Sequence, residues 1–225
     1  MKLFKNIIIG LVILLLVLAI VIVIAMLNLN NKTKKISNDY SDIASNSKYQ
    51  DVLLIDDLDY IKQDVSCGYA VIEMFAKWSG NESITEKYLY NKYKKVVTST
   101  GSKFEEEMNK QFPDYKTTMY KYLTNTELID KVYSSLKKEI PVPFEWAAKY
   151  KDEWTLHYSL IIGMDIPNDK VTILNPYGYK EEISVKELLD RTSFKAYKNM
   201  PIFLKLGFAF GIFEKNTIFI VKKNN

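Results

Sequence analysis

The chain has one cysteine, Cys67, and one histidine, His157, among its 225 residues, and together these two side chains could carry out nucleophilic chemistry. A cysteine thiolate is a strong nucleophile, and an imidazole beside it can take the thiol proton and later deliver it to a leaving group. A single cysteine excludes an intramolecular disulfide, and one cysteine with one histidine does not favour a metal cluster. We therefore expect neither a metal nor an organic cofactor.

Cys67 is predicted to lie in the first turn of a helix. The apolar residues that follow it recur at the spacing of one helical face, and Gly80 offers an end. These apolar residues are Ala70, Val71, Met74, Phe75 and Trp78. Ser66 is suited to cap the helix. Unpaired amides at a helix N-terminus place partial positive charge beside the thiol, so we expect a lowered pKa for Cys67.

His157 and Asn175 are predicted to lie close together in a β-hairpin. Residues 156–179 contain two apolar runs that are separated by Pro-Asn-Asp at 167–169, which is typical of a hairpin. In an antiparallel pair the start of the first strand lies beside the end of the second, which brings the two side chains together. A side-chain amide at this place could fix the tautomer and the plane of the imidazole.

Gln63 lies four positions before the cysteine and could donate its side-chain amide to an oxyanion, with the backbone amide of Cys67 as a second donor. Taken singly, each of these residues has an ordinary structural use, because free cysteine is among the most buried residue types. Their joint order along the chain is what indicates catalysis.

Three segments in this order resemble the peptidase C39-like branch of the papain-like cysteine peptidases: QDVSCGYA, HYSLIIGMD and ILNPYG. The resemblance covers residues 58–180 and implies an α+β fold of the papain-like type, with a helical part packed on an antiparallel sheet and the active site in the groove between them. It also implies a role for each candidate residue. Cys67 would be the nucleophile, His157 the general base and later acid, Asn175 the orienting third residue, and Gln63 the oxyanion donor.

Two positions depart from the family pattern. The family usually has aspartate where this chain has Asn175, and an amide can orient an imidazole but adds no charge that stabilises its cationic form. We expect this difference to moderate activity and not to abolish it. The glutamine also commonly precedes the cysteine by more than four positions, which bears on whether Gln63 reaches the oxyanion. Asp165, at the end of the histidine strand, is a second candidate for the third residue, and a turn residue before Pro167 is its ordinary interpretation.

Residues 7–27 form an uninterrupted apolar run of 21 residues, enough to cross a hydrocarbon core of about 30 Å. A cleaved signal peptide is the competing interpretation, but its apolar region would have about 7–15 residues. We expect a retained anchor. Lysines flank the run in similar number on both sides, so they do not fix its orientation. We expect an extracytoplasmic domain, because a lone N-terminal anchor commonly holds a domain outside the cell membrane.

The predicted organisation has four parts. They are a short basic N-terminus at 1–6, the anchor at 7–27, a polar tether at 28–50 and a peptidase C39-like domain at 51–225. In the domain we expect helices first and strands later. The C-terminal apolar stretch is predicted to form a short helix followed by an edge or closing strand at 217–221, with a hairpin that turns at 214–216 as the alternative.

The expected function is a membrane-anchored thiol peptidase that hydrolyses a peptide or amide bond through an acyl-enzyme on Cys67. The alternative is a catalytically inactive C39-like surface module that binds peptide without cleaving it. The expected partners are a peptide or protein substrate and the lipid bilayer, and a separate transporter stays open. The net charge of +4 is scattered over single lysines, so no nucleic-acid partner is expected. The usage of Lys, Asn and Ile is typical of a low-GC bacterium.

Overall fold

An antiparallel sheet of seven strands carries most of the site. In the computed structural model, which describes residues 2–224, the strand order is β2-β7-β3-β4-β5-β6, and the short β1 pairs with β4. The strands are β1 (Leu53–Leu54), β2 (Tyr115–Tyr120), β3 (Val142–Tyr150), β4 (Glu153–Asp165), β5 (Lys170–Asn175), β6 (Tyr179–Ile183) and β7 (Thr217–Lys223). The predicted hairpin is observed as β4 and β5. The predicted C-terminal strand is β7, but it lies inside the sheet, because it pairs with β2 on one side and β3 on the other, and not at an edge.

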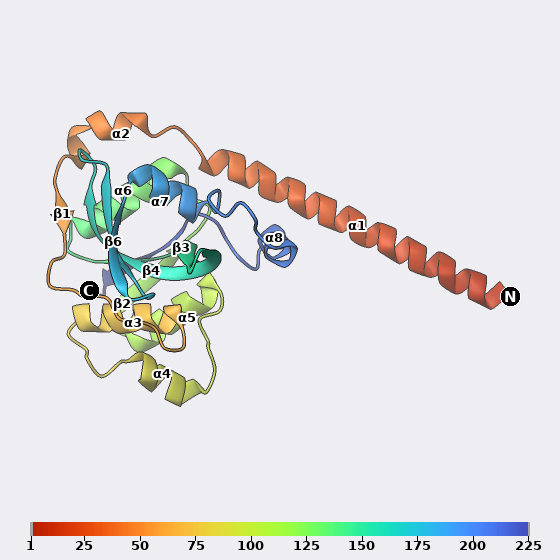
Figure 1. Ribbon diagram of the computed structural model, residues 1–225, viewed down its shortest axis with the longest axis horizontal. Helices are drawn as coiled ribbons and strands as arrows, with labels where there is room; N and C mark the ends of the chain where they lie inside the picture. Colours follow the sequence, from red (N-terminus) through yellow and green to blue (C-terminus); the bar gives the residue numbers. More distant parts are fainter. Residues whose placement is uncertain (1, 225) are drawn as a thin grey trace.

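Helices cover both faces of this sheet (Figure 1). One face carries α3 (Cys67–Trp78) and α5 (Gly101–Gln111), with α4 (Glu86–Tyr93) packed on α3; the other face carries α6 (Asn125–Leu136) and α7 (Val185–Thr192). Neighbouring residues of β4 therefore contribute to different cores: Leu160 packs with α3 and α5, and Ile161 packs with α6. A strand that is buried on both faces has a continuous apolar run, as β4 does. The predicted α+β architecture, with helices packed on an antiparallel sheet, is confirmed.

Helix α1 (Lys2–Ile36) projects from the domain as a long rod (Figure 1). It contains the apolar run 7–27, and by length and composition it is the one helix in the described residues that could cross a membrane. Most of its apolar side chains are exposed. The C-terminal end of α1 reaches the domain, where Ile36 is buried.

Residues 28–50, which were predicted to be a polar tether, are structured. The first part continues α1, and the rest forms α2 (Ser41–Ser45) and a 3-10 helix (Ser47–Tyr49). The Tyr49 hydroxyl donates a hydrogen bond of 2.7 Å to Asp130 of α6, and Ile43 and Tyr49 are both buried in the core. This segment therefore fastens the domain to the end of α1.

One carboxylate holds the loop that leads into α3. Glu86, the first residue of α4, is buried and accepts hydrogen bonds from three consecutive backbone amides. The donors are Asp64 at 2.8 Å, Val65 at 2.8 Å and Ser66 at 2.6 Å. Backbone amides buried without a partner are costly, so this carboxylate fixes how the chain enters the helix that begins at Cys67.

Replacing Glu86 with alanine is expected to destabilise the protein, because it leaves the buried amide of Ser66 and two part-buried amides without their acceptor. We expect a loss of about 1–3 kcal/mol in the free energy of unfolding, which lowers the Tm of a chain of this size by about 2–4 °C per kcal/mol. The measurement is thermal unfolding of the full chain in detergent micelles. Glu82→Ala, at an exposed glutamate nearby, is the matched control. Equal Tm values for the two variants would contradict this role of Glu86.

Candidate active site

The β4–β5 hairpin brings His157 and Asn175 into direct contact. His157 Nε2 lies 3.0 Å from Asn175 Oδ1, and His157 is only 2% exposed. The same Oδ1 accepts a hydrogen bond of 2.9 Å from the backbone amide of Tyr177. An amide oxygen only accepts, so this network assigns the ring proton to Nε2. The other ring nitrogen, Nδ1, is then the basic one, as a general base requires.

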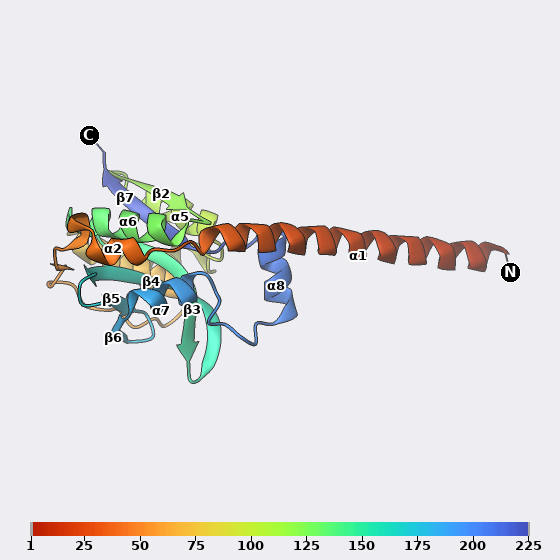
Figure 2. The ribbon, with the colours of Figure 1, turned by 90° about the horizontal axis from the view of Figure 1, so that it is seen from above.

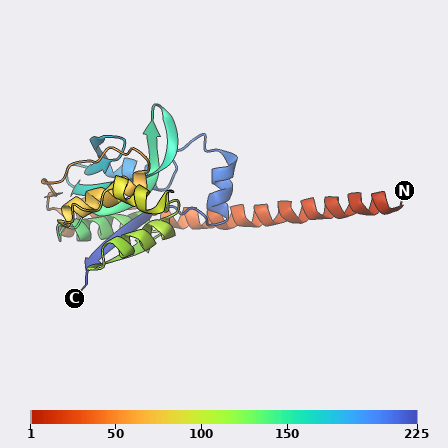
Figure 3. The same ribbon diagram turned by 90° about the horizontal axis from the view of Figure 1, so that it is seen from below.

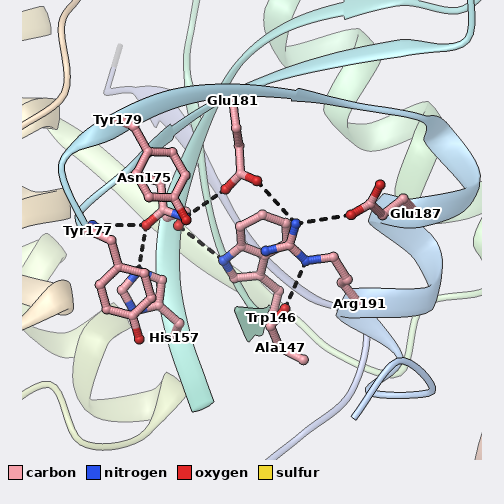
Figure 4. A network of polar contacts seen from close by, with 10 residues as sticks. Trp146, Ala147, His157, Asn175, Tyr177, Tyr179, Glu181, Glu187 and Arg191 are labelled. Atoms are coloured by element: carbon pink, nitrogen blue, oxygen red, sulfur yellow. Dashed lines mark hydrogen bonds and ion pairs between the residues drawn. The ribbon is translucent and has the colours of Figure 1, made fainter. Parts of the chain in front are cut away.

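The amide of Asn175 is held from its other side by Glu181 (Figure 4). Asn175 Nδ2 donates a hydrogen bond of 2.6 Å to Glu181 Oε1 and one of 3.2 Å to the Tyr179 hydroxyl. If the amide were turned over, its NH2 group would face the donors of His157 and Tyr177. Glu181 therefore fixes which end of the amide faces the imidazole.

Glu181 is in turn held by Arg191 of α7. Arg191 Nη1 lies 3.2 Å from Glu181 Oε2, and its Nε donates a hydrogen bond of 2.9 Å to the carbonyl of Ala147. The guanidinium also stacks over the ring of Trp146, 3.4 Å from the centroid. Sequence reasoning did not identify Glu181 or Arg191. The sequence did contain one sign of a special role for Arg191, since it is the only arginine in a chain rich in lysine. The planar guanidinium group suits a buried ion pair with a carboxylate.

The ring of Tyr177 covers the imidazole. The two rings are stacked with centroids 4.0 Å apart and planes at 15°, and the Tyr177 hydroxyl lies 2.6 Å from the Thr155 hydroxyl. Burial lowers the pKa of His157 to about 3, because it removes water from the charged form; the hydrogen bond to Asn175 acts in the opposite direction, and the charge of Arg191 lowers the pKa further. His157 is therefore a neutral imidazole at neutral pH.

Cys67 is the first residue of α3, as predicted, but its thiol is not acidic. Desolvation raises the pKa of Cys67 to about 11, against the lowering effect of backbone amides from Tyr158, Gly68 and Cys67 itself. The expected lowered pKa is therefore wrong, since burial outweighs the helix N-terminus. Ser66 occupies the N-cap position without a side-chain capping hydrogen bond.

Helix α3, which begins at Cys67, packs against β4, the strand that carries His157. Within residues 2–224 no hydrogen bond joins the sulfur to the imidazole. The resting site therefore contains a neutral thiol and a neutral imidazole on adjoining elements.

Comparison with known proteins places this arrangement in a family. The sequence matches the model of the Peptidase_C39 like family over residues 55–201, well over half of the chain. The chain belongs to this family. Among solved structures it is similar to a "double glycine motif protease from AMS/PCAT transporter in complex with the leader peptide", with 13% identity, a TM-score of 0.47, and coverage of 78% of this chain and 100% of that chain. No curated protein matches the sequence.

The other two candidate residues, Gln63 and Asp165, lie in different surroundings. The backbone amide of Gln63 donates a hydrogen bond of 2.8 Å to the carbonyl of Pro176, which places Gln63 beside the segment that follows Asn175. Its Oε1 is buried with no hydrogen-bond partner in the described part of the chain. Asp165 accepts two hydrogen bonds from Asn168 in the hairpin turn. Asp165 therefore acts as the turn residue, and Asn175 is the residue that contacts the imidazole.

One buried carboxyl, which helps to raise the pKa of Cys67 through its charge, was not identified from the sequence. Glu145 of β3 pairs with Tyr158 across the sheet, and neither of its oxygens has a hydrogen-bond partner among residues 2–224. Burial raises the pKa of Glu145 to about 8, and the charge of Glu214 raises it as well. A carboxyl inside the apolar run of β3 was the available signal.

Asn175 and Glu181 are expected to behave as a coupled pair in a double-mutant cycle. Asn175→Asp replaces a hydrogen bond of 2.6 Å with two carboxylates that face each other. Glu181→Gln places an NH2 group at position 181, which then faces a donor, either the NH2 group of Asn175 or the guanidinium of Arg191. Each single variant should lose about 1–3 kcal/mol of stability. The double variant should regain most of it, because the new glutamine can donate to the new aspartate and accept from Arg191. Thermal unfolding of the four proteins measures the coupling, and additive losses would contradict it.

Glu145 is expected to make stability fall as pH rises. Its pKa is about 8 in the folded chain against 4.5 in the unfolded chain, so between these values the folded state binds the extra proton. The folded state then loses about 1.4 kcal/mol per pH unit over this window. Glu145→Gln removes this contribution, so the stability difference from wild type should grow from pH 4.5 to 8, as followed by urea unfolding. Exposed Glu153→Gln should show no such trend, and a constant Glu145→Gln difference would contradict the assignment.

Proposed function

We propose that this protein is a membrane-anchored thiol peptidase that hydrolyses a peptide or amide bond through an acyl-enzyme on Cys67. The observation that supports this best is the hydrogen bond between His157 Nε2 and Asn175 Oδ1 in a chain of the peptidase C39-like family. It leaves Nδ1 as the basic nitrogen of a histidine on β4, the strand against which the helix of Cys67 packs.

The neutral resting pair defines how the reaction would begin. As the sulfur attacks the carbonyl carbon of the substrate, the thiol proton moves to Nδ1 of His157, and the carbonyl oxygen becomes an oxyanion. The backbone amide of Cys67 at the N-terminus of α3 and the side chain of Gln63 are the proposed oxyanion donors. The imidazolium then gives its proton to the leaving amine, which departs and leaves a thioester on Cys67.

A water molecule completes the cycle. His157, neutral again, takes a proton from water as the oxygen attacks the thioester, and the returned proton restores the thiol when the acid product leaves. Asn175 keeps the imidazole in one tautomer throughout. The carboxylate of Glu181 lies one hydrogen bond behind the amide, so it brings negative charge near the transient imidazolium. No metal or organic cofactor takes part in this proposal.

The proposed location is the cell membrane, with α1 as a single-pass anchor through residues 7–27 and the domain on the extracytoplasmic side. The length and composition of α1 support the span, since 21 apolar residues cover about 30 Å. The proposed substrate is a peptide or a protein, in agreement with the family.

A second candidate function is a surface module that binds peptide without cleaving it. The observation that favours it is the pair of pKa values, about 11 for Cys67 and about 3 for His157, because neither group is charged for nucleophilic attack at rest. A buried, inert thiol would serve only as packing.

The two functions differ in the alkylation rate of Cys67 by iodoacetamide. If His157 acts as a base, wild type should react faster than His157→Ala by about 10²-fold or more. This advantage should persist down to about pH 4, because the pKa of His157 is about 3. The full chain is used in detergent micelles, with Cys67→Ser to identify the labelled site. Equal rates that rise only toward pH 11 would contradict the peptidase.

Cleavage itself is measured by mass spectrometry. A peptide mixture incubated with wild type should gain new termini that are absent with Cys67→Ser. Retention of peptide by both proteins without new termini would support the binding module instead.

A further inference from the structure

Helix α8 (Ile202–Ala209) and the turn after it expose large apolar side chains. These residues, called the α8 surface here, are Ile202, Phe203, Phe210 and Ile212. Phe203 is 67% exposed and Ile202 is 66% exposed, although the neighbouring Phe208 is buried in a small core. One side of this short segment therefore packs on the protein, and the other carries aromatic and branched apolar groups without cover from the described residues.

The α8 surface lies beside the membrane-spanning candidate. Helix α8 contacts α1 and lies crosswise to it (Figures 2 and 3). Met26 and Leu29 of α1 share one small cavity with Lys205 and Phe208. The apolar run of α1 ends at residue 27, so α8 meets α1 where the hydrocarbon core of a bilayer would end.

We propose that the α8 surface lies in the bilayer interface, with α8 parallel to the membrane plane; this rests on the proposed anchoring of α1. A short helix with apolar groups on one side inserts that side at the boundary between headgroups and acyl chains. The exposed Lys195, Lys198 and Lys205 lie in and just before the same segment and suit anionic headgroups. The occupant of the α8 surface is lipid, since continuity with the apolar surface of α1 places it there.

The domain then has two attachments to the membrane. Helix α1 holds it by a span, and α8 holds it by a surface contact on one side of that span. Such a pair of contacts fixes the rotation of the domain about α1, which a single span leaves free.

The test uses the full chain with Cys67→Ser and one new cysteine that carries the fluorophore NBD. The three positions are Phe203 on the α8 surface, Leu16 in the middle of α1, and Val52 as a matched control. Val52 is 66% exposed, about as much as Phe203. It directly precedes β1, which lies on the side of the domain away from α1 (Figure 1). Each protein is reconstituted in vesicles of phosphatidylcholine and phosphatidylglycerol, and quenching by acyl-chain nitroxide lipids is compared with quenching by aqueous iodide.

We expect nitroxide lipids to quench the label at 203 several-fold more than the label at 52. A label at 16 that is quenched, with 203 behaving as 52 does, overturns the inference and leaves the anchor intact. Labels at 16 and 203 that both escape lipid quenching overturn the anchor as well. A label at 203 that is shielded from iodide without lipid quenching means that protein covers the surface, which also overturns the inference. A repeat at Ile202 guards against a local effect of one substitution.

Discussion

The orientation of one side-chain amide, that of Asn175, determines how the candidate site is built. Its oxygen faces the donors of His157 and Tyr177, and its NH2 group faces the carboxylate of Glu181. Only an amide satisfies both sides, because a carboxylate at 175 would meet a second carboxylate at 181. Where the family usually carries an aspartate in contact with the histidine, this chain has Asn175. The carboxylate of Glu181 lies one hydrogen bond further from the imidazole. Arg191 forms an ion pair with this carboxylate.

The packing that orders this amide also sets the charge state of the site. Tyr177 stacks on the imidazole, and two apolar cores lie against the faces of the sheet. A resting thiolate–imidazolium pair would require a proton to move from a group with a pKa of about 11 to one with a pKa of about 3. The neutral pair is therefore favoured. In the proposed reaction, charge separation would be driven by the substrate, through bond formation at the sulfur and donors at the oxyanion.

The sequence predicted those parts of the site that follow from local patterns. The contact between His157 and Asn175 follows from two apolar runs and a turn, and the start of a helix at Cys67 follows from its spacing. The sign of the Cys67 pKa shift could not be predicted, since desolvation depends on segments that are far away in the chain. No local sequence pattern marks Glu181, because its contacts with Asn175 and Arg191 form only when β5, β6 and α7 come together in the fold.

Composition misled most where a few apolar residues stand in a polar stretch. Residues 28–50 are rich in Asn, Ser and Lys, as a tether would be, yet Ile36, Ile43 and Tyr49 are buried against the domain. Isolated apolar residues show no periodicity, so only the tertiary structure reveals that they pack. The consequence is mechanical. Because α1 continues to Ile36 and the following residues are fixed on α6, the direction of α1 is coupled to the orientation of the domain.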